Sequence, residues 1–100
     1  MSFDIESRHL EIITKLLKKF VPDSTVYVFG SRAKNCAKPY SDLDLAIYTK
    51  DKKLDLSTLA KLNSAFEATT IPYKIDIIDL NNISEEFKIN INNDLVNLAF

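Results

Sequence analysis

The sequence predicts a small α/β protein in which a mixed β-sheet carries its helices on one side. Apolar residues recur at helical spacing in some segments and gather in short β-branched or aromatic runs in others, in the order helix–strand–strand–helix–strand–helix. The chain has 100 residues, 46% of them hydrophobic and 27% charged, which is ordinary globular usage and enough for one core. We therefore expect a single domain over residues 1–100.

The first two elements are a helix and a strand. Apolar residues fall on one broad face of a helix over residues 7–20, with Ser7 as the candidate N-cap and Pro22 ending the segment. Residues 25–29 are β-branched or aromatic and predict a strand. Gly30 ends this strand.

A second strand and a second helix follow. The polar segment 32–41 predicts a turn or loop, and the apolar run 43–48 predicts the strand after it. Apolar residues at helical spacing then predict a helix over residues 57–68. Pro72 separates this helix from the next strand.

The last two elements are a strand over residues 73–80 and a helix that begins at Ser84. Glu85 and Glu86 follow Ser84, and acidic residues suit the first turn of a helix. The apolar stripe of this helix is expected to contain Phe87, Ile91, Leu95 and Leu98. Asparagines in this segment are weak helix formers, so its C-terminal half would depend on packing.

Composition excludes several classes of function. The net charge of -1 provides no basic footprint for duplex nucleic acid. The single cysteine, Cys36, forms no internal disulfide and no cysteine-based zinc site, and the single glycine, Gly30, excludes the common glycine-rich nucleotide loops. The N-terminus lacks the pattern of a signal peptide, and no apolar stretch approaches the ~20 residues that span a bilayer. We expect a cytoplasmic protein with no membrane contact.

The residues that indicate chemistry are Gly30 and Ser31, followed after ten residues by Asp42 and Asp44. Successive side chains of a strand point to opposite faces, so Asp42 and Asp44 share one face about 6.6 Å apart. Two carboxylates at that spacing repel one another unless a cation lies between them. Hard oxygen ligands of this kind suit Mg²⁺.

A third carboxylate, Asp76, interrupts the apolar run of the last strand. If this strand lies beside the second one, Asp76 projects to the same face as Asp42 and Asp44, whereas Asp79 has the opposite parity and is expected at the surface or the strand end. Three carboxylates can hold two divalent ions ~3.5–4 Å apart, an arrangement that neutralises a triphosphate and stabilises leaving pyrophosphate.

The turn at Gly30 and Ser31 suits the phosphates of such a substrate. Glycine permits close approach of the backbone, and backbone N–H groups with the Ser31 hydroxyl can donate hydrogen bonds to phosphate oxygens. Arg32 and Lys34 add positive charge nearby.

Together these residues resemble the nucleotidyltransferases of the DNA polymerase β superfamily, and among them the minimal nucleotidyltransferases (MNT) that are paired with HEPN toxins. The resemblance covers about residues 5–90. It is carried by the pattern Gly30-Ser31-x10-Asp42-x-Asp44, by the later Asp76, and by the surrounding words FGSRAK, SDLDLAI and IDIIDL. The family often has a second glycine where this chain has Asn35.

The resemblance implies a polymerase β-like fold and transfer of AMP from ATP to a hydroxyl, most simply a tyrosine, of a HEPN toxin RNase that is thereby silenced. Asp42 and Asp44 would hold two Mg²⁺ ions, and Asp76 would complete the metal site and act as general base. Gly30 and Ser31 would bind the β- and γ-phosphates, with Arg32 assisting. The chain would then be the antitoxin of a toxin–antitoxin pair and form a hetero-oligomer.

Simpler interpretations stay open for each residue. Asp42 and Asp44 could be solvated acids at a strand start, and Asp76 could prevent association at a sheet edge. Arg32 could be a surface charge, and His9 is expected to be a solvated helix residue.

Two other functions also stay open. The chain could neutralise its partner by binding alone, with the catalytic fold as a relic. It could instead transfer the nucleotide to a small molecule such as an aminoglycoside, although no acceptor domain is visible in the sequence.

Overall fold

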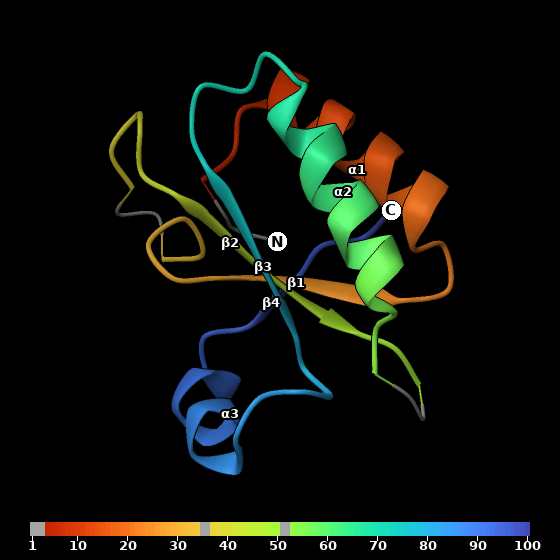
Figure 1. Cartoon of the computed structure of the whole chain (residues 1–100). Coiled ribbons are helices and arrows are strands. Elements are labelled where there is room, and N and C mark those ends of the chain that lie inside the picture. The colour runs from red at the N-terminus through yellow and green to blue at the C-terminus, as the bar shows by residue number, and fades with distance from the viewer. Residues whose placement is uncertain (1–3, 35–36, 51–52) are drawn as a thin grey trace.

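The computed structural model describes residues 4–34, 37–50 and 53–100, and Asn35 and Cys36 lie outside these ranges. The chain forms helices and strands in the order α1 (Ser7–Phe20), β1 (Thr25–Phe29), β2 (Leu43–Tyr48), α2 (Leu56–Glu67), β3 (Ile75–Asp79), α3 (Glu85–Asn92) and β4 (Val96–Asn97) (Figure 1).

The four strands form one mixed sheet in the order β3-β2-β1-β4. β1 pairs antiparallel with β2 and with β4, whereas β2 and β3 are parallel. A parallel pair cannot be joined by a hairpin, and here α2 provides the crossover between the two strands. The predicted mixed sheet is confirmed, with β2 as one of its two central strands.

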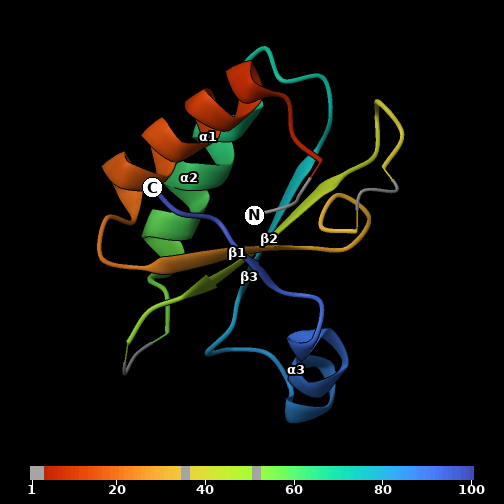
Figure 2. The same ribbon diagram turned by 180° about the vertical axis from the view of Figure 1, so that it is seen from behind.

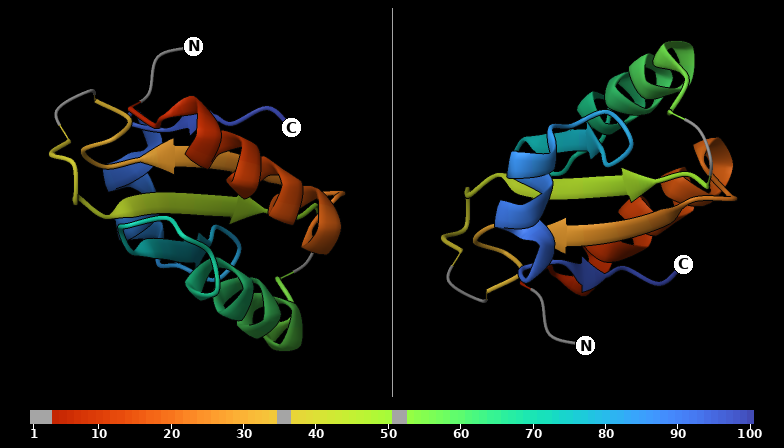
Figure 3. Two further views of the ribbon diagram at one scale, coloured as in Figure 1. Left: turned by 90° about the horizontal axis from the view of Figure 1, so that it is seen from above. Right: turned by 90° about the horizontal axis from the view of Figure 1, so that it is seen from below.

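The sheet has a different hydrophobic cluster on each face. Leu43, Leu45 and Ile47 of β2 are fully buried on the face that α1 and α2 cover. Ala46 points the opposite way and packs with Ile91 of α3. The views from above and below show α1 and α2 on one side of the sheet and α3 on the other (Figure 3).

The third helix therefore departs from the expectation of helices on one side. After β3 ends, Leu80 packs against Ala46 and Ile91 on the face away from α1 and α2. The view from behind shows α3 apart from the other two helices (Figure 2). Sequence periodicity identifies an apolar stripe on a helix, but the stripe fits either face of a sheet that is apolar on both.

Most predicted bounds agree with the structure within two residues, but the last helix is shorter than its apolar stripe suggested. It ends at Asn92, and Val96 and Asn97 form β4 against β1. Leu98 is buried in the cluster beneath α1 and α2 rather than on the α3 stripe. Consecutive asparagines favour a turn over continued helix, and pairing with the edge of β1 then satisfies the backbone.

The ends of two helices test the predicted caps. Ser84 is the N-cap of α3, and its hydroxyl accepts a hydrogen bond from the Phe87 amide at 3.1 Å, as predicted. Ser7 is instead the first residue of α1, and Glu6 occupies the N-cap position without a side-chain hydrogen bond.

His9 was expected to be solvated, and this prediction was wrong. His9 is 7% exposed, and its Nδ1 lies 3.2 Å from the Tyr73 hydroxyl. The helical position of His9 joins it to Ile13 and Leu17 on the buried face of α1.

None of the helices in the described part of the chain is long and apolar enough to span a membrane.

Replacing Leu45 by alanine should lower the free energy of unfolding by about 2–5 kcal/mol, because it leaves a cavity at a fully buried central-strand position. Urea unfolding followed by far-UV circular dichroism measures the change. Tyr48→Ala, at the exposed end of the same strand, is the control and should cost far less. Equal losses for both variants would contradict the assignment of the core to this face.

Candidate active site

The candidate site begins at the turn that follows β1. Gly30 has φ of +75°, a conformation that other residues adopt only with strain, and the Gly30 and Ser31 carbonyls accept hydrogen bonds from Ala33 N and Lys34 N at 3.1 and 3.2 Å. A Cβ at Gly30 would overlap the Asp44 carboxylate. Both the backbone angle and the space therefore require glycine here, and the turn lies directly against an acidic side chain.

The three predicted carboxylates gather on the α3 side of the sheet. Asp44 pairs with Phe29 at the end of β1 and with Asp76 on β3. The alternation of β2 places Asp44 on the same face as Ala46, and Asp76 is on the same face of β3 as Leu80. Asp42 lies just before β2 and is exposed. The structure thus brings Asp42, Asp44 and Asp76 to the open end of one face.

Burial and neighbouring negative charges both act on the Asp44 carboxyl group. Partial burial raises the pKa of Asp44 above its ordinary value, and the neighbouring charges of Asp76 and then Asp42 raise it further. Within the described ranges, no three acidic, histidine or cysteine side chains are close enough to form a preassembled metal site. The three carboxylates are therefore close enough for their charges to interact, but they are not close enough to form a preassembled metal site.

Asp76 has a cationic neighbour, Lys74, which was not among the predicted site residues. The Lys74 ammonium lies 3.2 Å from Asp76 Oδ1, and the two side chains are 73% and 40% exposed. Lys74 precedes Asp76 by two residues, so strand periodicity alone could have placed them on one face. A solvated pair of this kind contributes about 0–1 kcal/mol, so a divalent cation could displace it at little cost.

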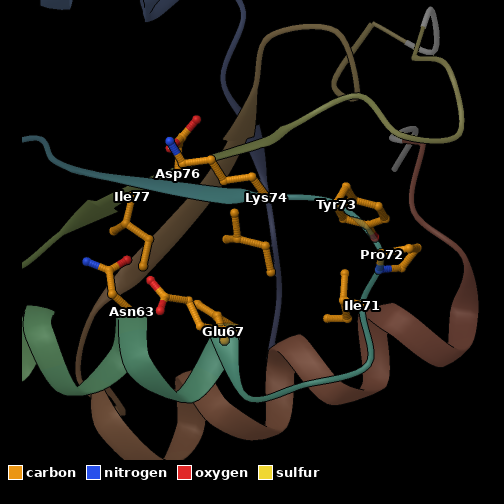
Figure 4. Close-up of a pocket in the computed structure, with 10 residues that line it drawn as sticks. Asn63, Glu67, Ile71, Pro72, Tyr73, Lys74, Asp76 and Ile77 are labelled. Atoms are coloured by element: carbon orange, nitrogen blue, oxygen red, sulfur yellow. The ribbon is translucent and has the colours of Figure 1, made fainter.

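A hollow near the site opens beside β3, next to the helix α2. It has a volume of about 490 Å³ and lies between the end of α2 and β3. Figure 4 shows Ile77 pointing from β3 towards Asn63 and Glu67 of α2, whereas Asp76 projects away from that helix. Lys74 and Asp76 also line this hollow, but Asp42 and Asp44 do not, so we place the chemistry on the carboxylate face.

Arg32 is the predicted site residue whose geometry differs most from expectation. It is 5% exposed, and its guanidinium donates hydrogen bonds to the backbone carbonyls of Asp4, Lys38, Pro39 and Ser41 at 2.8–3.4 Å. The guanidinium also lies 3.8 Å from the ring centroid of Tyr73. Arg32 is therefore neither a surface charge nor, in this geometry, directed at a phosphate.

Asp79 was expected at the surface or at a strand end. It is the last residue of β3, but it is buried, and its carboxylate accepts hydrogen bonds from Leu54 N and Asn81 N at 2.6 and 3.0 Å. It faces the loop before α2 and stabilises that connection, not the candidate site.

Residues 11–98 match the model of the polymerase β nucleotidyltransferase family. The chain belongs to this family. The nucleotidyltransferase is also 44% identical over 85 residues to a Haemophilus influenzae protein named "Probable protein adenylyltransferase MntA", a match that covers 85% of this chain and 74% of the relative.

Solved structures resemble the nucleotidyltransferase as well. A toxin–antitoxin complex with AMP-PNP matches with a TM-score of 0.73 and 25% identity, over 90% of this chain and 72% of the other. The complex of a tri-AMPylated Shewanella oneidensis HEPN toxin with MNT antitoxin matches with a TM-score of 0.63 and 24% identity, over 95% and 72% of the two chains. The predicted family and fold are thereby confirmed.

Gly30→Ala should destabilise the nucleotidyltransferase by about 1–2 kcal/mol from backbone strain alone, because alanine is strained at positive φ. The overlap with Asp44 adds to this cost and displaces the carboxylate. Urea unfolding measures the change. Ala37→Gly, in the adjoining loop, is a matched control for changing one methyl group, and an unchanged midpoint for Gly30→Ala would contradict the tight packing described here.

Asp44→Asn should raise the thermal unfolding midpoint at pH 7. A group whose folded pKa is raised contributes stability that is present below its unfolded pKa and is lost as the pH rises through the folded value. The advantage of asparagine is therefore largest near neutrality and disappears below about pH 4, where the carboxyl is protonated in both states. Differential scanning calorimetry from pH 3 to 7 measures the profile, with exposed Asp23→Asn as the control. A gain that is independent of pH would contradict the electrostatic cause.

Proposed function

We propose that this nucleotidyltransferase transfers AMP from ATP to a hydroxyl, most simply a tyrosine, of a HEPN-type toxin and so acts as its antitoxin. The observation that carries the proposal is the gathering of Asp42, Asp44 and Asp76 on one face beside the Gly30 turn. The adenylyl group and a protein acceptor are supported by the name of the 44% identical relative. The toxin–antitoxin complex with AMP-PNP supports an adenine nucleotide as donor.

The residues of the site fit Mg²⁺ as the cofactor. All three side chains are carboxylates, the ligand type that hard divalent cations prefer, and burial together with the charges of Asp76 and Asp42 raises the pKa of Asp44. We assign Asp42 and Asp44 to two Mg²⁺ ions and Asp76 to one of them. When bound, the ions would neutralise the triphosphate and lower the pKa of the acceptor hydroxyl.

The chain's own groups would bind the donor and accept a proton. Backbone N–H groups of the turn after Gly30, with the Ser31 hydroxyl, would hold the β- and γ-phosphates. The acceptor oxygen forms a bond to the α-phosphorus while the bond from that phosphorus to the β-phosphate bridging oxygen breaks, and pyrophosphate leaves. Asp76, at the open edge of the site, would accept the hydroxyl proton as general base.

The acceptor would come from outside this chain. α3 covers the distal part of the carboxylate face through Ala46 and Leu80, so Asp42, Asp44 and Asp76 are left at the end of the sheet. A protein partner that presents a side-chain hydroxyl to this end would complete the site. The resemblance of the site motifs to MNT proteins makes a HEPN toxin the partner that we propose.

The decisive experiment incubates the chain with Mg²⁺, ATP and its HEPN-type partner and measures the intact mass of the partner. We expect a shift of one or more AMP units, lost with EDTA and in the Asp42→Asn/Asp44→Asn double variant. Asparagine keeps the size of each side chain, so the fold should persist. Asp23→Asn, which removes an exposed carboxylate away from the site, is the matched control and should retain transfer.

Two outcomes would overturn the proposal. A partner that binds the chain and is inhibited without any mass shift would indicate an antitoxin that acts by binding alone. Pyrophosphate release with a small hydroxylated acceptor, but not with the protein, would indicate a small-molecule nucleotidyltransferase.

A further inference from the structure

We infer that Arg32 is a positioning residue that fixes Asp42 in the candidate site, rather than a phosphate-binding residue. The inference rests on the proposed function for the role of Asp42, but its structural basis is independent of any transfer reaction. Arg32 is among the few charged or polar side chains that are buried in the described part of the chain, at 5% exposure.

The guanidinium of Arg32 makes two hydrogen bonds to the peptide group that precedes Asp42. Nε and Nη2 of Arg32 both donate to the Ser41 carbonyl oxygen, at 3.0 and 2.8 Å. That carbonyl belongs to the planar peptide unit whose nitrogen is Asp42 N. Holding the oxygen by two bonds therefore orients the backbone on which the Asp42 carboxylate is mounted.

The same guanidinium joins two further parts of the chain, the loop at Lys38 and Pro39 and the segment at Asp4. Nη2 also donates to the Lys38 and Pro39 carbonyls, so several carbonyl groups of the loop before β2 point towards the Arg32 side chain. Nη1 donates to the Asp4 carbonyl at 2.9 Å, and the Asp4 amide donates to the Arg32 carbonyl at 2.6 Å. Each guanidinium nitrogen of Arg32 therefore donates to the backbone of this chain.

Tyr73 connects Arg32 to the strand that carries Asp76. The guanidinium lies over the Tyr73 ring at 3.8 Å, a cation–π contact, and the Tyr73 hydroxyl lies 3.2 Å from His9 Nδ1 of α1. The next residue, Lys74, accepts a hydrogen bond through its carbonyl from the amide of Leu43 at 2.9 Å. Arg32 thus fixes the start of β2 relative to the start of β3, the two points that set the distance between Asp42 and Asp76.

Lysine cannot replace arginine in this arrangement. The contacts use three nitrogens of a planar group that also stacks on an aromatic ring, whereas an ammonium is a point charge with three donors. Tyr73 belongs to the core cluster beneath α1 and α2, whereas Asp44 and Asp76 are on the α3 side of the sheet. This separates the guanidinium from the face where phosphates would bind.

Arg32→Lys distinguishes a positioning role from phosphate binding, because it keeps the positive charge but removes the planar guanidinium and its fixed donor directions. We expect faster amide hydrogen exchange in residues 37–43 and about a tenfold loss in affinity for Mn²⁺, used as a spectroscopic substitute for Mg²⁺ and titrated by electron paramagnetic resonance. In transfer assays, kcat should fall while KM for ATP changes by less than about twofold. A loss of this size is typical when a residue that orients a metal ligand, without touching the metal itself, is replaced.

Two variants serve as controls. Arg8→Ala removes an exposed positive charge from the same end of the molecule and should leave metal affinity and loop exchange unchanged. Tyr73→Leu removes the ring but keeps Arg32 and an apolar core residue. It should weaken metal binding less than Arg32→Lys does, and it replaces that variant if Arg32→Lys does not fold.

The inference is overturned if Arg32→Lys, or Tyr73→Leu in its place, leaves loop exchange and Mn²⁺ affinity at wild-type values. It is also overturned if Arg32→Gln raises KM for ATP while Arg32→Lys does not, because charge rather than geometry would then matter. Exchange and metal binding require neither the partner nor transfer. Absence of AMP transfer by the wild-type protein would thus count against the proposed function alone.

Discussion

The structure depends on the two-residue alternation of β2. Leu43, Leu45 and Ile47 are fully buried beneath α1 and α2, and Asp44 and Ala46 face the opposite way. A slip of one residue would place Asp44 in the core and the leucines on the carboxylate face, and both errors are costly. This cost fixes the pairing of β2 with β1 and β3. The same pairing brings Asp44 beside Asp76 and close to the Gly30 turn.

Patterns within short segments of the sequence predicted those elements whose formation depends mainly on residues close together in the chain. The bounds of α1, β1 and β2 follow from periodicity, β-branching and Pro22. Strand parity placed Asp42 and Asp44 on one face, and it added Asp76 on the condition that β3 lies beside β2, as it does. The misses depend on tertiary contacts. The burial of His9 requires Tyr73, which is distant in sequence, and nothing in the spacing of Arg32 shows that it folds back onto loop carbonyls. The face chosen by α3 is likewise decided by packing against Ala46.

The carboxylate cluster illustrates a site that is maintained against local electrostatics. Burial and like charges make the ionised form of Asp44 unfavourable, and the ammonium of Lys74 pairs with Asp76 rather than with Asp44. Proteins retain such arrangements where a ligand of opposite charge is to be bound. The buried scaffold on the opposite face supplies the stability that the cluster does not. One face of the sheet therefore holds the fold together, and the other presents charge to a ligand.

The crossover through α2 has a consequence for the order of events during synthesis. β2 and β3 are parallel neighbours, and the chain must complete the whole connection from Thr49 to Lys74 before Asp76 can pair with Asp44. A nascent chain that ends before β3 carries the Gly30 turn, Asp42 and Asp44 but lacks the third carboxylate. The complete carboxylate set therefore arises only after about three quarters of these 100 residues have been made, so a truncated translation product would lack it.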